Sequence, residues 1–242
     1  MDEEKPDLPI LYRDEHLVAI HKPAGLLVHR SSIDASETEY AVQRLRDQIR
    51  QRVYPLHRLD KPTSGVLLFA LHPEAVRVFS SLFETRKMDK TYIGVVRGHT
   101  ESMGTIDYPL TDELNPDNGA RAAITRYTLL HKVELEYPVG KYNTARYSVV
   151  AIHPETGRRH QIRRHFKHIF HPLIGDTTHG DGKHNRFFQE TLHSHRLLLA
   201  ATELGLVHPY TGKKLVISAP IETSFTQILH KLGWNNVSQQ LF

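Results

Sequence analysis

The sequence predicts an α+β fold, in which a mixed and mostly antiparallel sheet is flanked by helices. Short apolar runs recur along the whole chain and are typical of strands. Several are separated by tight turns, such as Thr211-Gly212 between 205–207 and 213–218. Amphipathic helical stripes interrupt these runs without the regular alternation that a parallel, doubly wound sheet requires. Frequent hairpins therefore favour α+β over α/β.

In the first part of the chain, a hairpin is predicted around Asp14-Glu15. Ser36 and Glu39 fit a capping box, which predicts a helix that ends near Arg52. The continuous apolar run 66–71 indicates a buried strand, and the stripe through Ala75 and Phe79 indicates a helix over 74–86.

In the second part, strands are expected at 91–97, 124–130, 146–152 and 196–201. Ile162 and Phe166 begin another helical stripe, and a last amphipathic helix contains 225–232. The polar segment 175–189 is expected to be an exposed loop.

Composition limits the classes of protein that are possible. A chain of 242 residues can bury the core of one domain or of two joined subdomains. We expect residues 1–9, which are acidic, to form a flexible tail, and 10–242 to form one catalytic domain of two fused subdomains. The absence of cysteine excludes disulfides, thiolate nucleophiles and zinc-thiolate sites. No signal peptide and no apolar run of ~20 residues is found, so a cytoplasmic protein that is not in a membrane is expected.

The first segment with candidate catalytic residues runs from His57 to Gly65 and reads HRLDKPTSG. Its acid, Asp60, lies between Arg58 and Lys61, and opposite charges favour the ionised carboxylate. Pro62 and Gly65 would fix the shape of the loop. A structural turn with surface ion pairs explains the spacing equally well.

Two further segments carry candidate residues. In Lys90-Thr91-Tyr92 the tyrosine could stack on an unpaired base, although tyrosines in strands are commonly structural. The second segment runs from Gly157 to Lys167 and has no acid among its basic residues, which favours phosphate contact over an ordinary solvated face of mixed sign. Its arginines and lysine are Arg158, Arg159, Arg163, Arg164 and Lys167.

Histidines are numerous, 18 in all, which raises the question of a metal site. The chain has no HExxH pattern and no cysteine, and clustered histidines beside arginines fit phosphate contact at least as well. No metal ion is therefore expected.

Taken together, these segments resemble the RluA-type family of pseudouridine synthases, and the finer resemblance is to the subfamily that modifies uridine 65 of tRNA. The resemblance extends over nearly the whole chain in the expected order. It rests on Leu11–Gly25, Leu26–Ser31, Arg44–Ile49, His57–Gly65, Lys90-Thr91-Tyr92, the insertion 111–122, Gly157–Arg163 and His171–Asp176. One departure is Ala200, which stands where relatives commonly have histidine.

The resemblance implies a pseudouridine synthase fold with a catalytic cleft, no preceding S4 domain, and a role for several residues. Asp60 would be the nucleophile, Arg163 its ionic partner, and Tyr92 the residue that stacks on the base and acts as general base. Arg58 would help to flip the target base out of its stack. RNA phosphates would be bound by Arg158, Arg159, Arg164, Lys167 and Lys90.

Isomerising uridine to pseudouridine involves no redox change, so no cofactor is expected, and the partner is RNA, most specifically tRNA, bound by a monomer. Whether Asp60 attacks C1′, attacks C6 or assists elimination stays open. A glycoside hydrolase would need a second carboxylate ~5–9.5 Å from the first, and no partner acid is evident. A synthase for rRNA or for a different tRNA position, and an RNA-binding protein without activity, stay open as well.

Overall fold

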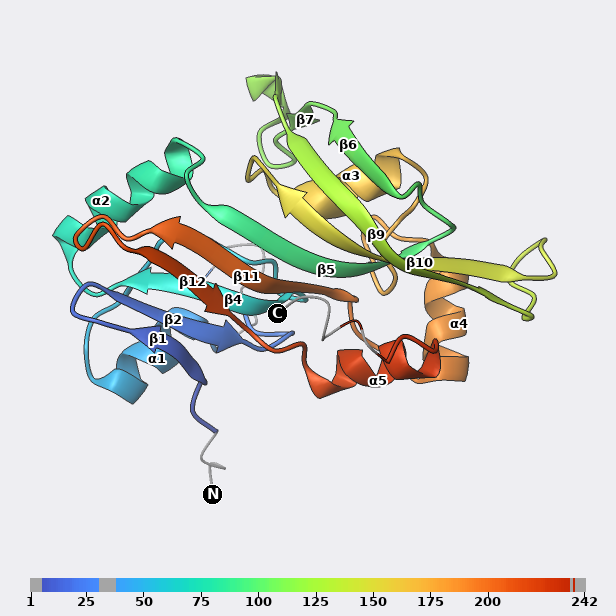
Figure 1. Cartoon of the computed structure of the whole chain (residues 1–242), viewed down its shortest axis with the longest axis horizontal. Helices are drawn as coiled ribbons and strands as arrows, with labels where there is room; N and C mark the ends of the chain where they lie inside the picture. Colours follow the sequence, from blue (N-terminus) through green and yellow to red (C-terminus); the bar gives the residue numbers. More distant parts are fainter. Residues whose placement is uncertain (1–5, 31–37, 236, 238–242) are drawn as a thin grey trace. The chain divides into compact units, whose positions relative to one another are not determined.

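The computed structural model describes residues 6–30, 38–235 and 237, and its helices and strands are drawn in Figure 1. The chain forms two compact units, each made of two segments of sequence. Unit 1 contains Met1–Asp89 and Ala201–Ala219, and unit 2 contains Lys90–Ala200 and Pro220–Phe242. The α+β prediction is confirmed, because every strand pair of described register is antiparallel and helices accompany the strands of both units.

The strands of unit 1 follow the order β1-β2-β4-β11-β12, and β3 also pairs with β4. Residues Leu17 to Lys22 of β2 face Ala70 to Gly65 of β4 without a break in register. Their bounds are β1 Ile10–Arg13, β2 Leu17–Lys22, β3 Tyr54–Pro55, β4 Ser64–Ala70, β11 Leu199–Val207, which begins in unit 2, and β12 Lys214–Ser218.

One face of this sheet packs against helix α2, Pro73–Glu84. Val66 and Leu68 alternate along β4 and bury against Ala75 and Phe79 of the helix, as a strand's period of two requires. The helix begins at a favourable N-terminus, because the His72 side chain accepts a hydrogen bond from the Ala75 amide and Pro73 occupies the first turn. All of β4 is buried, as its continuous apolar run predicted.

Two expectations for unit 1 differ from the structure. Helix α1 spans Ala41–Ile49 and follows Tyr40 without a side-chain cap, so Glu39 is outside it and the capping box is wrong; Ser36 is outside the described residues. The helix ends where Arg50 takes a left-handed conformation, ahead of the expected Arg52. The expected tail 1–9 also needs correction at its end, since Leu8 is buried and its backbone exchanges two hydrogen bonds with Gln48.

The larger sheet of unit 2 has the order β5-β10-β9-β6. A separate small hairpin is formed by β7 and β8, with the short 3₁₀ helix η1, Pro116–Asn118, between them. The strand bounds are β5 Asp89–Arg97, β6 Met103–Asp107, β7 Leu110–Thr111, β8 Ala120–Arg121, β9 Ile124–Leu135 and β10 Ala145–Pro154.

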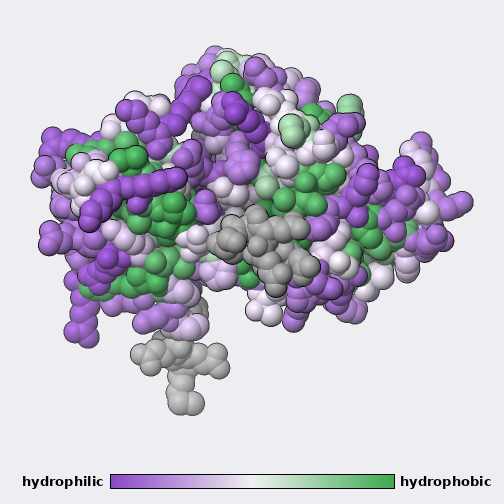
Figure 2. Space-filling model, viewed as in Figure 1, coloured by the Kyte–Doolittle hydropathy of each residue, from purple (hydrophilic) through white to green (hydrophobic). Residues whose placement is uncertain are grey.

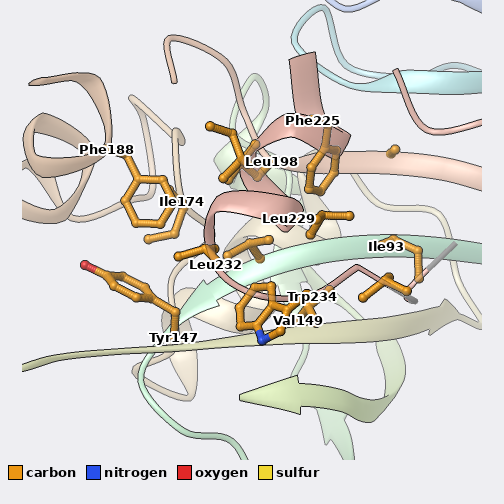
Figure 3. Packing of buried hydrophobic residues seen from close by; sticks show 14 of the residues in the cluster. Ile93, Tyr147, Val149, Ile174, Phe188, Leu198, Phe225, Leu229, Leu232 and Trp234 are labelled. Carbon is orange, nitrogen blue, oxygen red and sulfur yellow. The ribbon is translucent and has the colours of Figure 1, made fainter. Parts of the chain in front are cut away.

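Helices cover both faces of the unit 2 sheet. Val150 and Ile152 of β10 pack with α3, Gln161–His168, while Tyr147 and Val149 point to the opposite face. That face is covered by α4, Gly182–Leu192, and α5, Thr223–Lys231. Phe225 and Leu229 of α5 belong to the same buried cluster as Val149, and Figure 3 shows Phe225 beside Leu198. Alternate residues of one strand thus build two cores.

Helix α4 corrects the expectation of an exposed loop at 175–189. Asp181 caps it by accepting a hydrogen bond from the Lys183 amide, and Phe187 and Phe188 are buried in the core. Of the helices in the described ranges, none has the length and apolar character that crossing a membrane would require.

Candidate functional site

The loop that carries Asp60 is held by buried neighbours on both sides. Asp60 is half-buried between buried Leu59 and β4, Arg58 is exposed, and the Thr63 amide donates to the Asp60 carbonyl oxygen at 3.0 Å. His57 anchors the loop, because its Nε2 accepts from the Leu68 amide at 3.1 Å. Asp60 therefore lies on a short turn whose backbone is tied to the sheet.

A buried lysine fixes the other side of this loop. Lys22 is fully buried, and its Nζ donates to the carbonyl oxygens of Pro23 at 2.8 Å, Leu26 at 2.7 Å and Lys61 at 3.2 Å. The Gly25 amide donates to the same Lys61 carbonyl at 2.8 Å. Lys22 thus links the 23–26 turn to the residue that follows Asp60. It is part of the Leu11–Gly25 run, but spacing alone gave it no role.

Gly65 is required where the loop enters β4. Its φ is +119°, and a Cβ at this position would lie 2.0 Å from the Ala201 carbonyl oxygen. A side chain would therefore push β4 from the neighbouring β11 backbone. The expectation that Gly65 shapes the loop is confirmed.

In unit 2, Arg163 is buried and forms a two-point ion pair with Asp176. Its Nε donates to Oδ2 and its Nη2 to Oδ1, both at 2.8 Å. Asp176 Oδ1 also accepts from the amides of Thr178 and His179. Burial raises the pKa of Asp176, but the hydrogen bonds from Arg163 and these amides outweigh burial and hold the pKa below its usual value. The guanidinium is thereby held in one orientation.

The candidate catalytic residues are distributed over the two units. Asp60 and Arg58 belong to unit 1, whereas Tyr92 and Arg163 belong to unit 2. Tyr92 is half-buried on β5, opposite Ile152 of β10, and packs at the edge of the α3 core. The proposal that Asp60, Tyr92 and Arg163 act together thus remains a prediction.

Helix α3 is joined to β9 by a buried polar network around Gln161. Its Oε1 accepts from the Arg158 amide and from Thr156 Oγ1, while its Nε2 donates to the Ile124 carbonyl and to Thr125 Oγ1. Each polar atom of this buried amide is satisfied, so the turn before the helix is rigid. Gln161 lies in the 157–163 motif, but residue type and spacing indicated no role for it.

His165 continues this network in a defined tautomer. The Tyr108 carbonyl, 3.0 Å away, can only accept, so Nε2 of His165 carries the proton. Nδ1 then accepts from Thr125 Oγ1 at 2.9 Å. Burial is the main cause that lowers the pKa of His165.

We expect His165 to make the protein less stable in mild acid. Because its pKa is lowered on folding, only the unfolded chain takes up the proton, so stability present above about pH 6.5 falls as pH drops toward the folded pKa. His165→Gln should lose about 1–3 kcal/mol at pH 8 through the broken network, yet fall less between pH 8 and pH 5 than wild type. Urea unfolding at both pH values measures this, and equal falls in the two proteins would contradict it.

The basic residues before and along α3 meet an acid from the β7–β8 segment. Glu113 lies 3.4 Å from Arg159 Nε, 3.8 Å from Arg164 Nε and 2.9 Å from His160 Nδ1. Arg164 also donates to the Thr111 carbonyl at 2.8 Å. This partner acid, remote in sequence, corrects the interpretation of 157–167 as a purely cationic face.

The remaining candidate RNA contacts are placed separately. Arg158 donates to the Ala122 carbonyl at 3.2 Å, Lys167 is exposed on α3, and Lys90 is half-buried at the start of β5. Arg163 belongs to the same basic segment as Lys167, but it is buried against Asp176.

One group in the described part of the chain has the spacing of a metal site. Atoms of Glu113, His160 and His179 that could bind a metal lie within 4.8 Å of one another. The guanidinium groups of Arg159 and Arg164 lie beside the same carboxylate, and their positive charge opposes a cation there. The arrangement is better suited to fixing the β7–β8 segment on α3 than to holding an ion.

Comparison with known proteins identifies the family. The family model for RNA pseudouridylate synthase matches residues 16–168. The chain is 48% identical to tRNA pseudouridine synthase C of Vibrio parahaemolyticus, over 95% of this chain and 96% of that protein. It is 50% identical to the protein of that name from Haemophilus ducreyi, over 95% of this chain and 97% of the other.

Solved structures agree on the fold. The human RNA Pseudouridylate Synthase Domain Containing 4 matches with a TM-score of 0.70 and 24% identity, over 93% of each chain. The human RNA Pseudouridylate Synthase Domain Containing 1 matches with a TM-score of 0.68 and 24% identity, over 90% of this chain and 86% of that one. The family model and the relatives of 48% and 50% identity show that the chain belongs to the RNA pseudouridylate synthase family and is an isomerase.

Proposed function

We propose that this enzyme converts uridine 65 of tRNA to pseudouridine, with Asp60 as its nucleophile and without a cofactor. The observation that carries the proposal is identity of 48–50% over almost the full length of relatives named tRNA pseudouridine synthase C. The runs that resemble the subfamily, among them Leu26–Ser31 and Arg44–Ile49, support the position.

The reaction transfers uracil from an N1–C1′ bond to a C5–C1′ bond. The glycosidic bond breaks, the base rotates, C5 bonds to C1′ and the C5 proton is removed. A carboxylate serves each possible route, by attack on C1′, by attack on C6 or by assisting elimination. We assign this role to Asp60, whose loop is tied down by Lys22 and His57.

The other roles follow from side-chain chemistry. Tyr92 would hold the detached uracil by stacking, worth about 1–3 kcal/mol, and would accept the C5 proton. Arg163, oriented by Asp176, would keep Asp60 ionised and directed at the substrate. Arg58 is exposed and would replace the flipped base in its stack, which offsets part of the few kcal/mol that flipping costs.

Basic side chains bind the phosphates of the RNA backbone whatever the RNA sequence. Lys167 is exposed on α3, and Arg158, Arg159, Arg164 and Lys90 are assigned the same role. For Arg159 and Arg164, phosphate would have to compete with the Glu113 carboxylate that they now contact. We propose that the enzyme acts as a monomer in the cytoplasm.

The test uses unmodified tRNA transcripts and a chemical label specific for pseudouridine. Wild-type enzyme should produce label at position 65, and a transcript with cytidine at 65 should stay unlabelled. Label elsewhere in tRNA, or only in rRNA, would overturn the substrate assignment but not the activity. Tight tRNA binding without any label would favour a binding protein without activity.

A further inference from the structure

Phe170 combines two features that are unusual together: a left-handed backbone where α3 ends, and a large apolar side chain that is exposed. Its φ is +62°, in the left-handed region that favours glycine, and it follows α3 where the His171 amide donates to the Phe166 carbonyl at 2.9 Å. The residue is 80% exposed, although hydrophilic residues cover much of the surface visible in Figure 2. A bulky residue here is strained and gains little from burial.

No other described residue shares both features. The remaining non-glycine residues with positive φ are polar or charged, namely Arg50, Arg86, His160 and His193. Among the exposed large hydrophobic residues, Phe170 is the most exposed, ahead of Met103 at 70%. The left-handed turn itself ends α3, but glycine or a polar residue would serve there at a lower cost. An exposed phenylalanine retained in such a conformation is typical of a position that contacts a ligand.

The surroundings indicate the chemistry of that partner. Lys167 is exposed on the last turn of α3, and its carbonyl accepts from the Phe170 amide at 3.0 Å. The exposed ring of His168 on the same turn stacks on Tyr108 with centroids 3.7 Å apart. Cations beside exposed rings match nucleic acid, in which phosphates alternate with bases that have a flat apolar face.

We propose that Phe170 is an RNA-contacting residue that stacks on an unpaired or splayed base of the substrate while Lys167 contacts the adjacent backbone. This inference rests on the proposed function, because it takes RNA as the substrate. Arginines near the start of α3 are already proposed to contact RNA, and Phe170 adds a contact at the C-terminal end of this helix. The ring gains its partner only in the complex, which explains an exposed phenylalanine in a strained conformation.

The test exploits opposite effects on stability and on binding. Phe170→Gly relieves the strained backbone, so Tm should stay equal or rise by up to about 4 °C. KM for tRNA and Kd in filter binding should rise by about 5- to 150-fold, the loss expected for one stacked base, with kcat nearly unchanged. Phe170→Trp should retain binding within about threefold, since any aromatic face can stack.

His193→Gly is the matched control. His193 is also exposed, also has positive φ, 58°, and also follows a helix, so it receives the same backbone change. Its Kd and KM should stay at wild-type values. Equal Kd for wild type and Phe170→Gly overturns the inference, as does a fall in stability that accounts for the lost binding.

The experiments also distinguish an RNA contact from self-association, and failure of this inference from failure of the proposed function. Light scattering that shows a wild-type dimer converted to monomer by Phe170→Gly, with Kd unchanged, would assign Phe170 to self-association and overturn the RNA contact. Absence of pseudouridine from wild-type reactions would overturn the proposed function. The comparison of Kd values would still decide whether Phe170 contacts RNA.

Discussion

Asp60→Asn is expected to abolish pseudouridine formation while leaving tRNA binding close to wild type. The amide cannot serve as an anionic nucleophile or base, and loss of a nucleophile typically reduces turnover by at least about 10³-fold. Asp60 is half-buried on a loop anchored by backbone and Lys22 contacts, so a residue of the same shape should leave the fold intact. Single-turnover label formation at excess enzyme measures the chemical step separately from binding.

Asp60→Ala should be assayed in parallel, because slow deamidation of asparagine regenerates aspartate and could leave a trace of activity. Asp117→Asn is the matched control, since Asp117 lies on the exposed 3₁₀ turn η1 and has no role in the proposed chemistry. If Asp60→Ala retained more than about one tenth of wild-type turnover, Asp60 could not be the nucleophile. Loss of tRNA binding in both Asp60 variants would instead indicate a structural role.

Much of the fold could be predicted because its elements have strong local patterns. The 66–71 run became the fully buried β4, and the stripe through Ala75 and Phe79 became α2. Helix α4 was missed because its first turns are polar, and Phe187 and Phe188 are adjacent and so form no stripe at helical spacing. Helix α4 is stabilised by core contacts and by the Asp181 cap. Neither of these produces a hydrophobic periodicity in the sequence.

The candidate site was predictable only where its chemistry lies in contiguous motifs. Asp60, Tyr92 and Arg163 each belong to such a run, so residue type and resemblance pointed to them. Asp176 and Glu113 also lie in runs that support the resemblance, but nothing in those runs indicated what they would contact. Asp176 meets Arg163 across 13 residues, and Glu113 approaches α3 from a separate hairpin. Ion pairs between distant segments follow from the folded chain and have no sequence period.

Asp176→Asn is expected to lower the free energy of unfolding by about 3–5 kcal/mol, the usual cost of breaking a buried ion pair from one side. Its side chain is fully buried and accepts two hydrogen bonds from Arg163 and one each from the amides of Thr178 and His179. Asparagine keeps the shape but loses the charge and one acceptor. Equilibrium unfolding in urea measures the loss.

Asp181→Asn is the matched control, because its pair with Arg97 is partly exposed and asparagine caps α4 as well as aspartate does. It should cost at most about 1 kcal/mol. A similar cost for both variants would mean that burial adds nothing to the Arg163 pair. In a double-mutant cycle, Arg163→Met with Asp176→Asn should be less destabilised than the sum of the single changes by about 1–3 kcal/mol.

Acid provides an independent check on the same ion pair. The pKa of Asp176 is lowered on folding, so its contribution is present above about pH 3.9, the value for an unfolded chain, and is lost as pH falls through the folded pKa. The difference in stability between wild type and Asp176→Asn should therefore shrink as pH falls below about 4. A difference that stays constant down to about pH 2 would assign the loss to altered packing and not to the charge. The pair would then no longer explain how the Arg163 guanidinium is held in one orientation.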